Sequence, residues 1–336
     1  MKKLLPVLLA LVLIFSACEL LPDSGAKPQA ASDASIWAMD TVMDLRLYGD
    51  ADGSVMAELT ALLNELDREL SAVSEDSALT ALNESGRTDN ARIRLLAAEA
   101  QRVSGFTGGA LDITLLPVSR AWGFTTGSYR VPDAAELEAL RGLVGMDKLT
   151  LTDEGVSLSD GAMLDLGALV KGYAAELCRE RMEKAGLAGR LSLGGNIQTV
   201  GTKPDGSDWL IGVQDPEDEN RYLLTLRLSG AKALVTSGDY QRYFMQDGLR
   251  YCHILDPETL APVRGTLRAV TVVTDSGLYA DALSTALFVL GREAGEVLWR
   301  ERGDFEAIWA EADGTVWVTA GLADKVAEGE FEVVGP

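Results

Sequence analysis

Alternating apolar and polar residues predict β-strands in several separate stretches of the chain. Residues 39–48 alternate in this way, and residues 269–274 form another strand-like run. Residues 191–201 predict two strands joined by a Gly-Gly turn. Three more segments predict hairpins, because strand-like runs flank a short turn that contains Asp and Gly. These segments are residues 149–158, 233–255 and 305–319, with turns at Asp153–Gly155, Gln246–Gly248 and Ala312–Gly314.

Apolar residues three or four positions apart predict helices between these strands. The clearest case is residues 54–70, whose apolar face runs from Met56 to Leu66. Because helices and hairpins are mixed, the pattern predicts an α+β fold with mixed or antiparallel sheets and packed helices, rather than a doubly wound sheet. Further helices are expected at residues 91–104, 132–143, 169–185 and 277–302, and the Gly-rich residues 105–124 predict a loop that enters a buried segment.

The N-terminus has the pattern of an export signal. Lys2 and Lys3 precede an apolar run over residues 4–15, and Ser16-Ala17-Cys18 follows. The run is too short to span a bilayer comfortably, and Phe15–Cys18 resembles a bacterial lipobox. We therefore predict a lipoprotein signal peptide over residues 1–17 and lipidation of Cys18. The protein would then be held at the cell membrane by its lipid anchor, on the extracytoplasmic face.

Residues 18–35 are small, polar and Pro-containing, which predicts a flexible tether before a globular domain over residues 36–336. In an exported protein Cys178 and Cys252 could pair. Single cysteines in apolar surroundings are more often ordinary core residues. The sequence leaves the two alternatives open.

Composition and charge limit the classes of ligand. The 336 residues are 47% hydrophobic and 24% charged, as in globular proteins. Acidic residues outnumber basic ones 51 to 30, so the formal net charge is −21 and nucleic-acid binding is disfavoured. A polyanionic ligand would need a metal ion, backbone N–H groups or a well-placed Lys. Three Cys and one His argue against a classical zinc site.

Two segments offer groups for a phosphate and a metal ion. Lys171 lies at the predicted start of a helix, after Gly167 and Ala168, where the backbone can approach a ligand closely. A capping Asp with a solvated Lys would explain this segment equally well. Asp281 and Thr285 are four residues apart on one helix face, and their oxygens are of the kind that Mg²⁺ takes. Alternatively, the Thr hydroxyl bonds back to a helix carbonyl.

Two other segments also allow a structural and a functional interpretation. The turn at Gly194-Gly195-Asn196 permits either positive φ angles or a close ligand. His253 is the single histidine of the chain and lies on a predicted hairpin strand shortly before Asp256-Pro257. It is either a structural residue or a general base.

Together these segments resemble the FAD:protein FMN transferase (ApbE) family over most of residues 39–291, and their order and spacing make the resemblance specific. Three positions depart from the residues frequent in the family: Asp40 and Leu260 replace Gly, and Leu111 replaces Phe. Asp40 and Leu111 concern the shape of the pocket more than its chemistry, whereas Leu260 bears on the turn after His253. The matching segments are Met39-Asp40-Thr41, Ser71 with Ser77 and Asn83, Gly109–Thr114, Trp122-Gly123-Phe124, Asp165–Gly172, Gly194-Gly195-Asn196, Ser237–Tyr240, His253–Pro257 and Ala280–Thr285.

The resemblance implies a reaction and a set of site residues. The family transfers FMN from FAD to a Thr or Ser hydroxyl of an acceptor flavoprotein and releases AMP. Mg²⁺ would be bound by the Ala168 carbonyl, Asp281 and Thr285. His253, with a pKa near the ordinary ~6.5, and Asp281 are the candidate catalytic bases. FAD would be bound by Met39, Ala110, Leu111, Asp112, Asp165, Lys171, His253 and Ile254.

Two alternative functions remain at this stage. Water could replace the acceptor hydroxyl, which would make the protein a Mg²⁺-dependent FAD pyrophosphatase. The chain could also be a non-catalytic FAD-binding lipoprotein, although the complete set of metal-binding residues favours an enzyme. The expected acceptor is a subunit of a membrane redox complex or a secreted flavoprotein.

Overall fold

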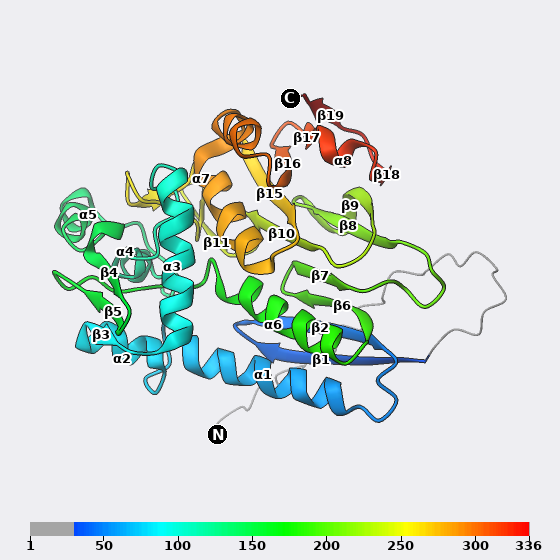
Figure 1. Ribbon diagram of the computed structural model, residues 1–336. Helices are drawn as coiled ribbons and strands as arrows, with labels where there is room; N and C mark the ends of the chain where they lie inside the picture. Colours follow the sequence, from blue (N-terminus) through cyan, green and yellow to red (C-terminus); the bar gives the residue numbers. More distant parts are fainter. Residues whose placement is uncertain (1–29, 336) are drawn as a thin grey trace, which may run out of the picture.

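A nine-stranded sheet forms the centre of the molecule in the computed structural model, which describes residues 30–335 (Figure 1). Neighbouring strands are antiparallel except for β17 and β19, which are parallel. The predicted α+β fold is therefore confirmed. In spatial order the strands are β1 (Ala31–Ala38), β2 (Thr41–Tyr48), β6 (Ala188–Leu193), β7 (Asn196–Val200), β10 (Ala233–Gly238), β15 (Leu267–Thr274), β16 (Glu306–Glu311), β17 (Val316–Thr319) and β19 (Glu332–Val334).

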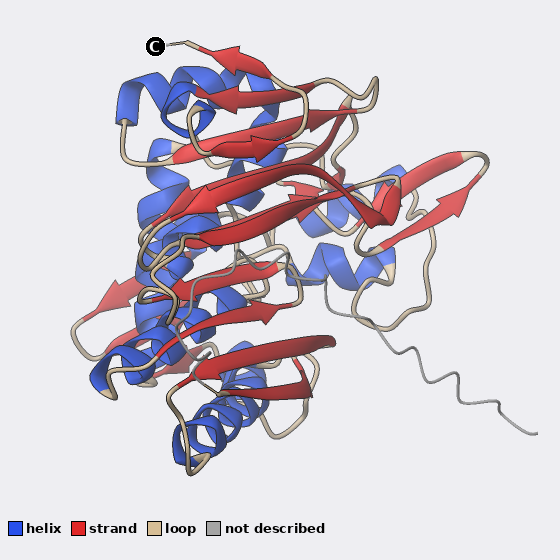
Figure 2. Cartoon of the chain, turned by 90° about the vertical axis from the view of Figure 1, so that its right-hand side faces the viewer, coloured by secondary structure: helices blue, strands red, loops and turns tan. Residues whose placement is uncertain are grey.

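Helices cover one face of this sheet, as Figure 2 shows. The helices α1 (Ser54–Leu70), α6 (Val170–Lys184) and α7 (Gly277–Arg302) pack on the strands, and α3 (Ala91–Phe106) packs on α7. Their buried side chains form one continuous core with the inward residues of β2, such as Leu45. Shorter helices are α2 (Ala78–Ser85), α4 (Leu116–Trp122), α5 (Ala134–Arg141), α8 (Ala320–Ala323) and the 3₁₀ turn η1 (Met146–Lys148).

Small sheets complete the fold. One of them has three strands: β8 (Trp209–Asp215), β9 (Asp218–Leu228) and β18 (Val326–Glu328). Its apolar side chains form a second core with Leu234 and Ile308 of the main sheet. This core lies on the face of the main sheet that the helices leave open. The remaining strands are β3 (Arg87–Thr88), β4 (Leu149–Thr152) and β5 (Gly155–Leu158), the hairpin β11 (Tyr243–Gln246) and β12 (Leu249–Cys252), and the pair β13 (Leu255–Asp256) and β14 (Ala261–Pro262).

The structure corrects the predicted tether at its C-terminal end. Residues 31–35 belong to β1, which pairs with β2 along its whole length from Ala31 opposite Tyr48 to Ala38 opposite Thr41. Backbone pairing therefore orders a stretch whose small polar side chains resemble a linker. The rest of the tether, the predicted signal peptide and Cys18 lie outside the described residues.

Both Cys178 and Cys252 are free and buried, so the disulfide that the sequence left open does not form. None of the helices in residues 30–335 has the length and hydrophobicity needed for a bilayer span.

Candidate active site

A pocket of about 860 Å³ opens where the β1–β2 turn, the β6–β7 turn and the starts of α6 and α7 come together. Every residue that the family resemblance assigned to FAD, metal or base lines this one pocket. Distant parts of the sequence thus supply a single site. These residues are Met39, Ala110, Leu111, Asp112, Asp165, Ala168, Lys171, His253, Ile254, Asp281 and Thr285.

The β1–β2 turn forms one wall of the pocket. Met39 and Asp40 have φ angles of 51° and 57°, and two successive residues with positive φ make the tight hairpin turn that suits twisted strands. Asp tolerates this conformation, so the replacement of the frequent Gly by Asp40 keeps the turn. The Asp40 carboxylate lies 3.6 Å from the guanidinium of Arg242 across the pocket mouth.

The paired glycines of the β6–β7 turn serve packing as well as the pocket. A Cβ on Gly194 would lie 2.5 Å from the Thr41 hydroxyl, so only glycine fits against the neighbouring β2. Gly195 lines the pocket with φ at 95°. Asn196, the next residue, is buried, and its side chain lowers the pKa of the Asp281 carboxyl.

Asp281 is a buried carboxylate held by the start of α6. Its Oδ2 accepts a hydrogen bond of 2.8 Å from the Gly172 backbone N–H. Burial raises the pKa of Asp281, and the charge of Lys171 and the Gly172 N–H oppose this effect. The carboxylate is thus costly to charge unless a cation is close by.

Thr285 lies one turn further along the same helix, in contact with a second hydroxyl. Its Oγ1 is 3.3 Å from Ser237 Oγ, which in turn is 2.9 Å from Ser284 Oγ. The hydroxyl that bonds back to the Asp281 carbonyl, at 3.0 Å, belongs to Ser284. Thr285 is therefore not occupied by the helix bond that offered the alternative explanation.

The donor set at this position suits a hard cation. No cluster of three or more His, Cys, Asp or Glu side chains that could hold a metal exists within residues 30–335. Asp281 and Thr285 share the pocket with Ala168, so a carboxylate, a hydroxyl and a backbone carbonyl are available. Oxygen ligands of this kind fit Mg²⁺, which commonly takes one or two protein carboxylates and completes its shell with phosphate oxygens and water.

His253 is fixed by the backbone of Arg242. The carbonyl of Arg242 accepts a hydrogen bond of 3.0 Å from the His253 backbone N–H, and ring Nδ1 lies 3.2 Å from the same oxygen. Because a carbonyl can only accept, Nδ1 carries the proton and Nε2 is the basic nitrogen. Burial, assisted by the charges of Arg242 and Lys171, lowers the pKa of His253 to about 4. The expected pKa near 6.5 is therefore wrong.

Asp165 is positioned by neighbouring backbone rather than serving as a helix cap. Its Oδ1 accepts from the Gly167 N–H at 2.8 Å, whereas the N-cap of α6 is Leu169, with no side-chain cap. Burial raises the pKa of Asp165. Asn83 bonds both backbone groups of Leu164, at 2.7 and 3.0 Å, which fixes the residue just before Asp165.

Asp112, which also lines the pocket, is held in the same way. Its carboxylate accepts from the backbone N–H and the hydroxyl of Thr114, at 2.7 and 2.6 Å, and burial raises its pKa. The Asp165 N–H donates to Ile113 at 2.8 Å, so the two carboxylates belong to one connected wall.

Sequence reasoning missed the β8–β9 turn, which also lines the pocket through Asp215, Pro216, Glu217 and Glu219. The signal was present, because Asp-Pro between two apolar runs is typical of a turn. Arg268 pairs with both Glu217 and Asp239, and thereby connects this turn to the end of β10.

The turn after His253 is preserved although Leu260 replaces the frequent Gly. Leu260 adopts a φ of 57° and is fully buried in a small cluster with Trp122 and Tyr251. Its carbonyl accepts a hydrogen bond of 2.9 Å from the Trp122 indole. Burial thus compensates for an unfavourable backbone conformation.

Comparisons with known proteins agree with this geometry. The model of the ApbE family matches residues 39–309. Proteins named FAD:protein FMN transferase from Vibrio cholerae and Salmonella typhimurium are 32% and 30% identical to the chain, over 86% and 92% of it and 88% and 93% of their own lengths. The crystal structure of the flavinyl transferase ApbE of Pseudomonas stutzeri, in its apo form, has a TM-score of 0.80 at 31% identity and covers 90% of this chain and 98% of its own.

Proposed function

The chain belongs to the ApbE family of enzymes, and from this premise we propose that it is a FAD:protein FMN transferase dependent on Mg²⁺. The acceptor would be a Thr or Ser hydroxyl of a flavoprotein, and AMP would be released. The proposal rests on one observation. The proposed metal ligands Ala168, Asp281 and Thr285 line the same pocket as Lys171 and His253. Its volume, about 860 Å³, is within the range of small-molecule sites.

The proposed reaction is a displacement at phosphorus. The acceptor oxygen bonds to the FMN-side phosphorus of FAD while the bond from that phosphorus to the bridging oxygen breaks, and AMP leaves with this oxygen. The hydroxyl proton passes to a base, for which His253 Nε2 is the first candidate and Asp281 the second. Since Nδ1 faces the Arg242 carbonyl, the ring is in the tautomer that can accept at Nε2.

The charges of the pocket support the proposed need for a cation. The pyrophosphate of FAD is anionic, and the lining of the pocket includes the acidic residues Asp112, Asp165 and Glu217. Lys171 supplies one positive charge at the start of α6, where backbone N–H groups also favour anions. When bound by Ala168, Asp281 and Thr285, Mg²⁺ would neutralise developing charge on the phosphates.

Hydrolysis is the nearest alternative, since water could take the place of the acceptor hydroxyl. Incubation with FAD, Mg²⁺ and a candidate acceptor flavoprotein, followed by separate measurement of acceptor-bound FMN, free FMN and AMP, distinguishes the two. We expect one AMP per FMN bound to the acceptor. Free FMN in excess at saturating acceptor would show a pyrophosphatase, and binding of FAD without AMP release would show a carrier protein.

The N-terminal pattern supports a location for this reaction. We propose that the domain is attached by lipid at Cys18 on the extracytoplasmic face of the cell membrane, where membrane redox subunits and secreted flavoproteins would be its acceptors.

A further inference from the structure

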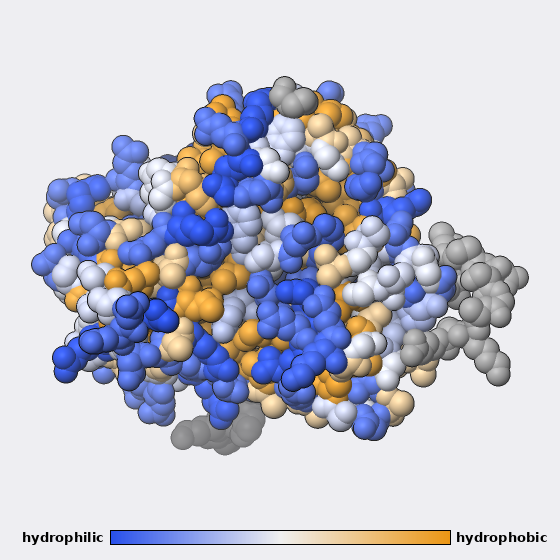
Figure 3. Space-filling view, in the orientation of Figure 1, coloured by the Kyte–Doolittle hydropathy of each residue, from blue (hydrophilic) through white to orange (hydrophobic). Residues whose placement is uncertain are grey.

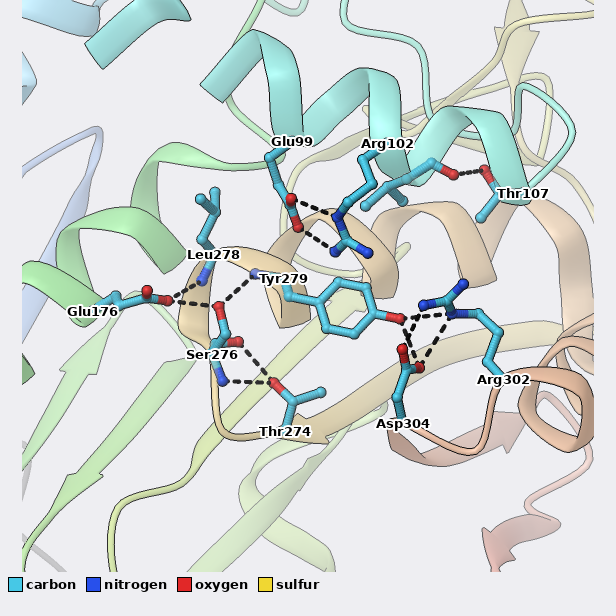
Figure 4. Close-up of polar contacts among 11 residues, drawn as sticks. Glu99, Arg102, Thr107, Glu176, Thr274, Ser276, Leu278, Tyr279, Arg302 and Asp304 are labelled. Atoms are coloured by element: carbon cyan, nitrogen blue, oxygen red, sulfur yellow. Dashed lines mark hydrogen bonds and ion pairs between the residues drawn. The ribbon is translucent and has the colours of Figure 1, made fainter. Parts of the chain in front are cut away.

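The first turn of α7, which leads to Asp281 and Thr285, is held by a carboxylate from another helix (Figure 4). The Oε2 of Glu176 on α6 accepts from the Ser276 hydroxyl at 2.6 Å and from the Leu278 backbone N–H at 3.3 Å. Ser276 is the N-cap of α7, and its hydroxyl also accepts from the Tyr279 N–H at 3.2 Å. Glu176 therefore binds both the cap and the first turn of this helix.

The two helices touch closely beside this contact. A Cβ on Gly172 would lie 2.2 Å from the Gly277 carbonyl, and a Cβ on Gly277 would lie 2.6 Å from the Gly172 carbonyl. Gly172 is also the residue whose N–H donates to Asp281. Because Gly172 and Glu176 are four residues apart on α6, both present the same helix face to α7.

We propose that Glu176 is a positioning residue for the metal site, which holds α7 against α6 so that Asp281 and Thr285 stay in place beside Ala168. Ala168 lies just before α6, and Asp281 and Thr285 lie on α7, so the relative position of the two helices sets the spacing of the three ligands. This inference rests on the proposed function, because it takes these three residues to be the Mg²⁺ ligands.

Glu176 belongs to α6, so its bonds to the start of α7 also connect the two helices. Ser276 already caps α7 without help from another helix. Glu176 does not line the pocket, so it acts on the ligands only through α7. Its negative charge at the positive end of the helix dipole strengthens the contact. Groups that hydrogen-bond directly to metal ligands typically change metal affinity 10- to 100-fold when they are lost, and Glu176 acts one step further away, through the first turn of α7.

The test is a Mg²⁺ titration of the purified protein with saturating FAD. The half-saturating Mg²⁺ concentration is measured by the rise in melting temperature, which does not depend on turnover, and again by FMN transfer. Glu176→Ala should raise this concentration about 10-fold or more. Glu176→Gln should restore most of the affinity, because its amide oxygen can accept the same two bonds. Glu180→Ala, an exposed residue one turn further along α6, is the matched control and should match the wild type.

A purely structural role predicts a different outcome. In that case Glu176→Ala would lower the melting temperature without Mg²⁺ and leave the half-saturating concentration unchanged, which would overturn the inference. If this variant does not fold, Glu176→Asp serves instead, since its shorter side chain keeps the charge and cannot reach both donors. An unchanged Mg²⁺ requirement in it also overturns the inference. A wild-type protein without any Mg²⁺ response would instead contradict the metal site of the proposed function.

Discussion

At the residue scale, the environment of His253 sets the pH range in which it can act. Its pKa is lowered to about 4, so Nε2 stays unprotonated while the pH falls from 7 to 5. We expect kcat/KM for transfer to hold over that range and to fall about tenfold per pH unit only below pH 4. His253→Ala should reduce transfer roughly 10²–10⁴-fold. Because burial also raises the pKa of Asp281, an acid limb that persists in this variant belongs to the pocket carboxylates, and one that disappears belongs to His253.

The measurement is a pH profile of both proteins at saturating Mg²⁺, with circular dichroism to confirm that the fold persists in acid. An acid limb near pH 6.5 in the wild type would contradict the lowered pKa. Normal transfer by the variant would remove His253 as the base and leave Asp281 as the remaining candidate.

Substitution of Asp281 should reduce transfer more than substitution of Thr285. The Asp281 carboxylate is buried, and its raised pKa reflects a charge that lacks solvation. Asp281→Ala should therefore abolish transfer at any Mg²⁺ concentration. Thr285→Ala would remove one proposed neutral ligand and should raise the Mg²⁺ requirement, whereas Thr285→Ser should behave as the wild type. Titration of transfer with Mg²⁺ checks this, and full activity of Asp281→Ala in a chelator would refute the metal assignment.

Leu260 combines strain with burial, and the balance between them can be measured. A φ of 57° costs a non-glycine residue roughly 1–2 kcal/mol, whereas removing a buried Leu side chain costs about 2–5 kcal/mol. Leu260→Gly should therefore lower the free energy of unfolding by about 1–3 kcal/mol, and Leu260→Ala, which keeps the strain, by more. Urea denaturation at constant pH measures both changes. A Gly variant more stable than the wild type would show that burial does not compensate.

At the element scale, α7 depends on a break that glycine alone can provide. Gly291 has φ 76° and ψ 174°, outside the helical region, and the helix continues beyond it (orange in Figure 1). The break lets the two ends of α7 meet, because Arg302 Nε donates to the Tyr279 hydroxyl at 3.1 Å (Figure 4). This hydroxyl also donates to Asp304 at 3.0 Å.

Gly303, which ends α7, provides a matched control for Gly291. It has φ 63° and ψ 16°, the left-handed region that Asn tolerates. A Cβ added to either glycine would meet open space within 4 Å, so the two positions differ in backbone conformation rather than in crowding. Gly291→Asn should cost about 1–3 kcal/mol of unfolding free energy, since its conformation is open essentially to glycine alone. Gly303→Asn should cost clearly less, and equal losses in urea denaturation would contradict this account.

Elements with strong periodicity were predictable, whereas a strand of small polar residues was not. The predicted boundaries of residues 54–70 and 277–302 agree with α1 and α7, although the break at Gly291 inside α7 was not predicted. The strands β1 and β8 and the helix α2 were not predicted. β1 carries mostly small polar residues and owes its state to its register with β2.

The pocket residues were predictable for a different reason. Motifs shared with the ApbE family identify Asp165, His253 and Asp281 in the sequence. The fold then places these three residues in one pocket, although they lie far apart along the chain. The pKa of His253 could not be predicted, because it depends on burial and on Arg242 and Lys171 in space. The role of Glu176 was hidden for the same reason, since its partners lie 100 residues away.

At the scale of the whole molecule, charge argues that attachment to a membrane would need the lipid. The formal net charge is −21, and the face shown in Figure 3 is mostly hydrophilic with small apolar patches. Cytoplasmic and extracytoplasmic membrane surfaces that carry anionic lipids repel such a protein. Adsorption through a basic patch is therefore a poor explanation for membrane binding of this domain.

A substitution at Cys18 separates location from catalysis. Cys18→Ser removes the thiol that would carry the lipid, so we expect the protein to leave the membrane fraction and to lack the mass of the acyl groups. Because Cys18 precedes the first strand, β1, in the sequence, we expect purified protein to transfer FMN to a soluble acceptor at the wild-type kcat/KM. In cells, flavinylation of membrane acceptors should fall more than flavinylation of secreted ones, since the lipid raises the local concentration only at the membrane. Unchanged fractionation and mass in Cys18→Ser would disprove lipidation at this residue, whereas a loss of transfer in solution would show that the N-terminal segment takes part in the reaction itself.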